Sequence, residues 1–238
     1  MVLTMQYLLR QWWKRENPKV LLILFVRALL AMAIAGFAWY SEVDDASYLS
    51  AVEKAVVQEV NLARTNPQRY ATFVEEVKRK YDGKRLIREG KLPLVTNEGA
   101  KAADEAIRFL RKQKPLAALT ASSGMSLAAR DHVKDQGPRG KTGHDGSDGS
   151  QPWDRVSRYG TWESKTAENI AYGHSEAREI VIAIIIDDGV PKRGHRKNIF
   201  DPEFRIIGVA TGAHAKFGAM CVMTFAGGFI EKSGERNK

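Results

Sequence analysis

The chain has 238 residues, of which 44% are hydrophobic, and its formal net charge at pH 7 is +9. This length suits one globular domain with an appendage. Residues 1–40 hold +4 of this charge and the remaining +5 is spread along the rest. The chain has no basic stripe interleaved with aromatic residues, so we do not expect a nucleic-acid-binding protein. The single cysteine, Cys221, excludes an intrachain disulfide framework and a cysteine-based zinc site, and we expect it to be buried in an apolar strand.

An apolar segment near the amino terminus, residues 20–40, has the length of a membrane-spanning helix. Basic residues precede it and acidic residues follow it, which predicts a cytoplasmic amino terminus and export of the remainder. We therefore predict a cytoplasmic segment at 1–19, a single-pass signal anchor at 20–40 and a linker at 41–49, with the protein held in the cell membrane. The alternative is secretion after cleavage near Ala35, where small residues suit a signal peptidase.

Two helices are predicted at the start of the exported part. Apolar residues recur at helical spacing in the first of them, at Leu49, Val52, Val56 and Val60. Asn66 can cap the second helix, and Pro67 suits its first turn. The apolar face of the second helix is expected to comprise Tyr70, Phe73, Val74, Val77 and Tyr81. A loop with a short extended piece is predicted over 83–95.

Two further helices and a loop are predicted next. Asn97 can cap a third helix that turns Ala100, Ala103, Ile107 and Leu110 inward. Another helix is predicted through 125–136, after two serines. Residues 137–150 are rich in glycine and aspartate and are predicted to form a loop, and their acid spacing does not match an EF-hand.

The last third of the chain combines one very apolar segment with strand-forming sequences. Residues 180–186 are apolar on all sides, which fits either a buried helix or a buried strand. A cap at Ser175 and a glycine at 189 favour the helix. The segments 205–212 and 217–228 are rich in β-formers and predict an antiparallel hairpin. Helices around a few terminal strands predict an α+β layered domain.

Two aspartates follow the apolar helix directly. Asp187 and Asp188 lie at a helix carboxyl end, where the dipole disfavours acids, so they are either simply solvated or functional. His195 follows after a turn and can fold back toward them. His144 lies on a glycine-rich loop, and Glu168 lies in an otherwise uncharged run, where a partly buried carboxylate needs partners. Sequence spacing by itself does not show that these residues meet.

Four segments in order, NLARTNP, GHDGSDGSQPWDRVSRYG, AENIAYG and DDGVPKRGHRKNIF, resemble the bacterial, SCP-like branch of the CAP superfamily. This superfamily includes cysteine-rich secretory proteins, antigen 5 proteins and pathogenesis-related proteins. The resemblance covers residues 50–229 and leaves 230–238 as a tail. It implies a three-layer α-β-α sandwich with a large central cleft. The cleft residues that it implies are His144, Glu168, Asp187 and His195, with Asp188 as the alternative second acid.

The chain also departs from the better-studied relatives. The second acid is commonly glutamate in eukaryotic members, where this chain has Asp187. The sequence GHRKNI lacks the aromatic residues of the eukaryotic version, and the disulfides of many relatives are absent. The activities of animal and plant members are therefore not carried over.

The resemblance and the residue types together predict a binding site. Two neutral imidazoles, His144 and His195, can hold a divalent metal such as zinc, with the acids as ligands or supporting partners. The same four groups can instead form a closed hydrogen-bond network that shapes a cleft. We predict a membrane-tethered extracytoplasmic domain that binds a divalent metal, a small or lipidic molecule, or a protein partner. The alternative is a metal-dependent peptidase or esterase in which Glu168 and His195 act in catalysis.

Overall fold

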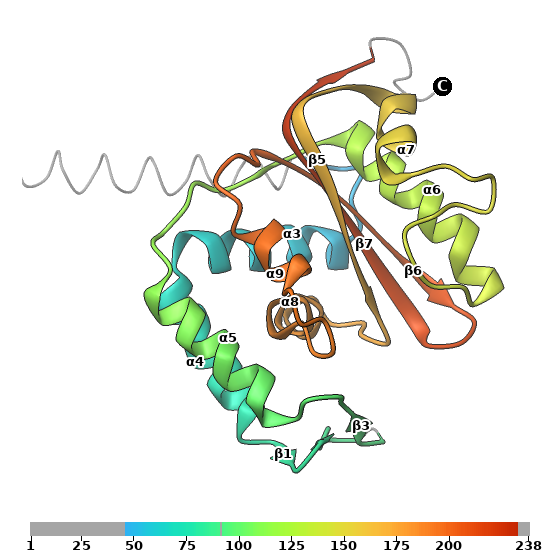
Figure 1. Cartoon of the computed structure of the whole chain (residues 1–238). Helices are drawn as coiled ribbons and strands as arrows, with labels where there is room; N and C mark the ends of the chain where they lie inside the picture. The colour runs from blue at the N-terminus through green and yellow to red at the C-terminus, as the bar shows by residue number, and fades with distance from the viewer. Residues whose placement is uncertain (1–45, 91, 233–238) are drawn as a thin grey trace, which may run out of the picture. The chain divides into compact units, whose positions relative to one another are not determined.

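A computed structural model describes residues 46–90 and 92–232 (Figure 1). Ala46–Lys238 forms one compact unit, and its helices and strands supply an extensive buried core. Because this core lies inside the unit, we expect a fragment spanning 46–238 to fold without the segment before it. The membrane helix predicted at 20–40 lies outside the described residues. Within the described ranges, no helix is long and apolar enough to cross a membrane.

A four-stranded sheet forms the centre of this unit, in the order β4-β6-β7-β5. The strands are β4 (Thr120–Ala121), β5 (Gly160–Tyr172), β6 (Ile206–His214) and β7 (Gly218–Glu231). Strands β6 and β7 form the predicted antiparallel hairpin, which is confirmed. Strand β5 pairs antiparallel with β7 and is an edge strand of the sheet, while β4 pairs parallel with β6.

Helices cover both faces of this sheet (Figure 1). On one face lie α6 (Ser123–Arg139) and α7 (Pro152–Tyr159), and on the other lie α3 (Ala51–Thr65), α8 (Ala177–Ile186) and α9 (Gly194–Ile199). Helix α6 packs so closely on β6 that a methyl group at Gly208 would stand 2.2 Å from the backbone carbonyl carbon of Met125. The predicted α+β class is confirmed, and so is the helical assignment of 180–186.

Both faces of β7 are buried. Successive side chains of a strand point to opposite faces, and helices cover this sheet on both sides. One face contributes to an apolar cluster of Ala129, Val133, Ile170, Ala210, Met220 and Val222. The opposite face of β7 presents Cys221, Met223 and Phe225, which are fully buried. Cys221 is a free thiol inside an apolar strand, as predicted, and burial raises its pKa well above the ordinary thiol value.

A second helical pair and a small sheet complete the unit. Helices α4 (Pro67–Lys78) and α5 (Ala100–Lys112) pack against each other, and between them in the chain lie β1 (Tyr81–Asp82), β2 (Arg85–Leu86) and β3 (Leu94–Val95). These three strands form an antiparallel sheet, which agrees with the extended piece predicted over 83–95. Asn66 accepts a hydrogen bond from the backbone N–H of Arg69, so the predicted cap of α4 is confirmed.

Some predicted boundaries are wrong. Helix α5 begins after Gly99 and not after Asn97, because Asn97 is held instead by the side chain of Asp188. Tyr81 belongs to β1 and not to the second helix. Ser175 does not cap α8, whose N-cap position is the next residue.

Candidate functional site

The structure brings His144 and His195 close together, although 51 positions separate them in the sequence. His144 lies in the loop between α6 and α7, and His195 lies in the first turn of α9. Their ring centroids are 6.4 Å apart, and the ring planes are tilted by 37°. The side chains are 45% and 25% exposed, so solvent reaches both imidazoles.

Glu168 of β5 anchors the first imidazole. Nδ1 of His144 lies 2.9 Å from Oε1 of Glu168, and a carboxylate oxygen accepts, so Nδ1–H donates and Nε2 keeps its lone pair. The second carboxylate oxygen, Oε2, accepts from Nη2 of Arg155 at 2.9 Å. The side chains of Glu168 and Arg155 are only 1% and 2% exposed, so this is a buried ion pair with hydrogen bonds on both carboxylate oxygens.

Arg155 also holds the loop that carries His144. Its Nη2 donates to the carbonyl oxygen of His144, and its Nη1 donates to that of Ser150. Sequence reasoning did not identify Arg155, because α7 was not predicted. The signal was nevertheless present: Pro152 suits the first position of a helix, and Asp154 completes a capping box with the residue before Pro152.

A third histidine, His132 of α6, lies beside the same carboxylate. It is fully buried, its Nε2 donates to the carbonyl oxygen of Gly143 at 2.9 Å, and this nitrogen lies 4.0 Å from Oε1 of Glu168. Burial lowers the pKa of His132, chiefly by disfavouring the charged ring. No local pattern singles out this histidine in the sequence, because its carboxylate neighbour lies 36 positions away.

Asp187 anchors the second imidazole. It follows α8 in a left-handed backbone conformation, with φ 57° and ψ 45°, which turns its side chain back toward α9. Its Oδ1 lies 2.6 Å from Nδ1 of His195, and its Oδ2 accepts from the backbone N–H of the same residue at 3.0 Å. The carboxylate is almost fully buried. It bonds to Nδ1 of His195 and not to Nε2, the other ring nitrogen.

Asp188 takes a different direction. Its carboxylate accepts from the backbone N–H groups of Asn97 and Glu98, immediately before α5. The two adjacent aspartates therefore have separate roles: Asp187 orients His195, and Asp188 joins the end of α8 to the start of α5.

Two arginines explain how acids are tolerated at the end of α8. Arg196 donates to the carbonyl oxygens of Ile185 and Ile186, and Arg193 donates to that of Asp187. These carbonyls have no partner within the helix, so the guanidinium groups satisfy them and supply positive charge at the negative end of the dipole.

The edge strand β5 reaches both histidines. Glu168 bonds to His144, while the next residue, Asn169, donates from Nδ2 to the carbonyl oxygen of His195 at 2.9 Å. Consecutive side chains of a strand point to opposite faces. The pair therefore spans the sheet edge, with one histidine held from each side of β5.

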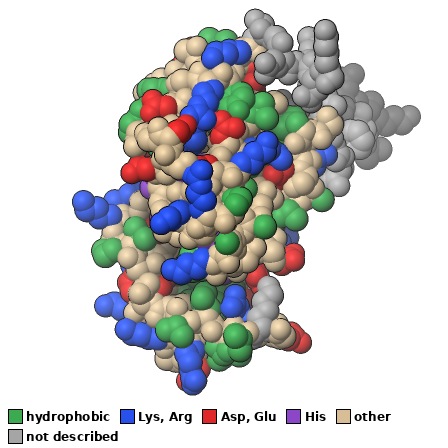
Figure 2. All heavy atoms as spheres, turned by 90° about the vertical axis from the view of Figure 1, so that its right-hand side faces the viewer, with side chains coloured by type: hydrophobic (Ala, Val, Ile, Leu, Met, Phe, Trp, Pro, Cys, Tyr) green, Lys and Arg blue, Asp and Glu red, His purple; other side chains and the backbone are tan. Residues whose placement is uncertain are grey.

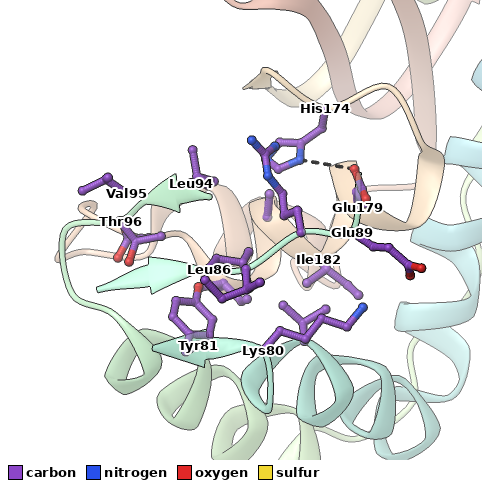
Figure 3. Close-up of a pocket in the computed structure, with 16 residues that line it drawn as sticks. Lys80, Tyr81, Leu86, Glu89, Leu94, Val95, Thr96, His174, Glu179 and Ile182 are labelled. Atoms are coloured by element: carbon purple, nitrogen blue, oxygen red, sulfur yellow. Dashed lines mark ion pairs between the residues drawn. The ribbon is translucent and has the colours of Figure 1, made fainter. Parts of the chain in front are cut away.

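The described side chains do not include a ready-made metal cluster: no group of three or more His, Cys, Asp or Glu residues is arranged to hold an ion. A pocket of about 530 Å³ lies elsewhere, between the end of α4, the small β1–β3 sheet and α8 (Figure 3). Asp188 lines this pocket, but His144, Glu168, Asp187 and His195 do not.

A sequence comparison identifies the family of the chain. A family model described as CAP, cysteine-rich secretory protein family, matches residues 105–225. No curated protein matches the chain.

Three solved bacterial structures are similar to part of the chain. An extracellular SCP-domain protein from Bacillus anthracis shares 23% identity at TM-score 0.38, over 52% of this chain and 38% of its own. An outer surface protein from Borrelia burgdorferi shares 18% identity at TM-score 0.40, over 56% of this chain and 89% of its own. A cysteine-rich secretory protein from Staphylococcus aureus shares 14% identity at TM-score 0.33, over 54% of this chain and 38% of its own.

Proposed function

Because the chain belongs to the CAP family of cysteine-rich secretory proteins, we propose that it is an extracytoplasmic binding module in which His144 and His195 hold one divalent metal ion, such as zinc. One observation carries the proposal: each imidazole is fixed through Nδ1 by a buried carboxylate, and the two rings are 6.4 Å apart. Metal-bound histidines typically donate their other ring nitrogen to a carboxylate in this way.

The residues fit an ion with an open coordination sphere. Nε2 of each imidazole would supply the lone pair that binds the metal. Two protein ligands would leave further coordination positions for groups from a bound molecule. When bound, the ion would act as a Lewis acid that attracts carboxylate, imidazole or carbonyl groups of a small molecule or protein partner. Glu168 and Asp187 would orient the ligands rather than bind the ion, because their oxygens are already engaged.

The burial of Glu168 favours binding over hydrolysis. A general base must have a lone pair within reach of the water that it activates. Both oxygens of Glu168 accept hydrogen bonds, from His144 and Arg155, and the Glu168 side chain itself is only 1% exposed. Cleavage of a peptide or ester by the zinc-loaded protein that is lost in Glu168→Gln would favour the hydrolase instead.

Membrane tethering is part of the proposal and is supported by the sequence alone. The apolar segment 20–40 with basic residues before it favours an anchor with the amino terminus in the cytoplasm. Mass spectrometry of the amino terminus of protein from native membranes tests this. An intact first segment supports the anchor, whereas a terminus just after Ala35 shows cleavage and release.

Calorimetric titration of zinc into the untagged fragment 46–238 tests the metal site. We expect saturable binding at one ion per chain, with an affinity at least tenfold weaker in His144→Ala and in His195→Ala. Glu168→Gln should weaken it about 10–100-fold, the usual effect of losing a group that orients a ligand. His174→Ala is the matched control and should bind as the parent does. Absence of zinc uptake, or uptake that neither His144→Ala nor His195→Ala changes, would contradict the proposal.

A further inference from the structure

The hairpin formed by β2 and β3 exposes large aliphatic side chains. Ile87, Leu92 and Val95 are 44%, 84% and 75% exposed, and all three lie within a stretch of nine residues. Scattered exposed aliphatic residues are normal, but three on one small hairpin that lies at the periphery of the unit form a concentrated apolar surface (Figure 1).

Basic residues are frequent in the segment that leads into this hairpin. From Lys78 to Arg88 the chain has six bases and one acid, an excess of five, while the whole chain has a net charge of +9. Lys78 pairs with Asp104 and Arg85 with Asp82, but the other bases have no such carboxylate partner among the ion pairs of the described residues. In Figure 2, basic and apolar side chains lie beside each other at the lower end of the molecule.

The exposed apolar surface continues into the pocket of about 530 Å³ (Figure 3). Ile87 and Val95 belong both to the exposed set and to the lining of this pocket. Deeper lining residues are aliphatic, among them Leu86 and Ile182. Lys80 and Arg88 also line the pocket, so these bases and the apolar side chains border the same opening, which carries the acids Glu89, Glu179 and Asp188 as well.

From this arrangement we infer that the segment 78–95, which runs from the end of α4 through the β2–β3 hairpin, is a docking surface for an anionic phospholipid bilayer. Aliphatic side chains enter the boundary between headgroups and acyl chains, and neighbouring bases contact anionic headgroups. A nucleic acid would share the charge complementarity but would call for aromatic stacking or base-reading polar groups, whereas the exposed groups here are Ile, Leu and Val. His144, Glu168, Asp187 and His195 do not line the pocket beside this surface, so the inference does not depend on the function of the histidine pair.

Vesicle co-sedimentation of the fragment 46–238, which lacks the predicted anchor, tests the inference. Vesicles of phosphatidylcholine alone are compared with vesicles that also contain phosphatidylglycerol. We expect binding to the anionic vesicles only, weakened by salt. Lys80→Gln combined with Lys84→Gln should lower the partition coefficient about 30-fold, because each basic residue near the surface contributes about fivefold. Leu92→Ser should lower it about tenfold by removing an inserted apolar group.

Two variants serve as matched controls. Ile230→Ser removes an exposed aliphatic side chain at the far end of β7, and Lys134→Gln removes an exposed base on α6, so neither should change partitioning. Both hairpin variants alter exposed residues, and an unchanged urea midpoint would show that they fold normally. Failure of the parent fragment to bind anionic vesicles overturns the inference, as does equal loss in the hairpin and control variants. Self-association through the hairpin without vesicle binding would assign the surface to a second copy and also overturn it.

Discussion

Replacing Arg155 with methionine is the sharpest test of how the histidine pair is supported. The change removes the positive partner of Glu168 while keeping an apolar side chain of similar length in α7. Because both side chains are almost fully buried, the carboxylate would be left charged and uncompensated. Breaking a buried pair in this way typically costs about 3–5 kcal/mol. The carbonyls of His144 and Ser150 lose their donor as well, so we expect the effect to lie in the upper part of that range.

Urea denaturation of the fragment 46–238, followed by circular dichroism and fluorescence, measures this cost. The two probes should give the same transition, and the midpoint should fall without a change in the slope m. Arg158→Met is the matched control on the same helix. Arg158 pairs with Asp131 and Asp148, but its side chain is 41% exposed, so its loss should cost less than about 1 kcal/mol.

A double mutant separates the ion pair from simple packing. In Arg155→Met combined with Glu168→Gln, no charge remains at either position, so the double mutant should be more stable than Arg155→Met alone. The two single effects should therefore be strongly non-additive. Additive effects, or a cost for Arg155→Met as small as that for Arg158→Met, would show that the pair does not hold the loop that carries His144.

Three further predictions concern other parts of the unit. Arg193 lowers the pKa of Glu98 to about 2. This carboxylate therefore stabilises the fold above its unfolded pKa of about 4.3, and the contribution is lost as pH falls toward 2. Between neutral pH and pH 3, the melting temperature of Glu98→Gln should accordingly fall less than that of the parent. Gly208→Ala should cost about 1–3 kcal/mol in urea denaturation, because its methyl group meets the backbone of α6 at 2.2 Å, whereas Gly194→Ala enters open space and should have little effect. Cys221 should not react with a thiol reagent in the native protein and should react once urea unfolds it, and rapid native labelling would contradict its burial.

The helical parts of the fold follow from the sequence, because their signals are local. The spacing of apolar residues and the Asn66-Pro67 start located α3 and α4, and the uninterrupted apolar run located α8. Strand β5 was missed because its burial does not alternate. Its pairing with β7 is irregular between Glu163 and Thr166, where Ser164 has a φ of 68°, and this break hides the period of two.

The candidate site shows the same limit at the level of single residues. His144, Glu168, Asp187 and His195 were selected together only through a resemblance, since spacing alone does not reveal which side chains meet. The sequence signals the start of α7, but it does not show that Arg155 and His132 contact Glu168, because these links cross between α6, α7 and β5. Likewise, two adjacent aspartates look equivalent in sequence, and only the left-handed turn at Asp187 separates their directions.

Both histidines of the candidate site are held by the edge strand β5, so the site depends on how β5 pairs with β7. Glu168 and Asn169 are consecutive, and they hold the two histidines from opposite faces of β5. A slip of one residue in the pairing of β5 with β7 would exchange those faces and turn the carboxylate toward α9. The buried pair with Arg155 opposes such a slip, because the slip would leave an unpaired charge on each side. The ion pair that stabilises the fold is therefore also what keeps Glu168 on the side of β5 where it bonds to His144.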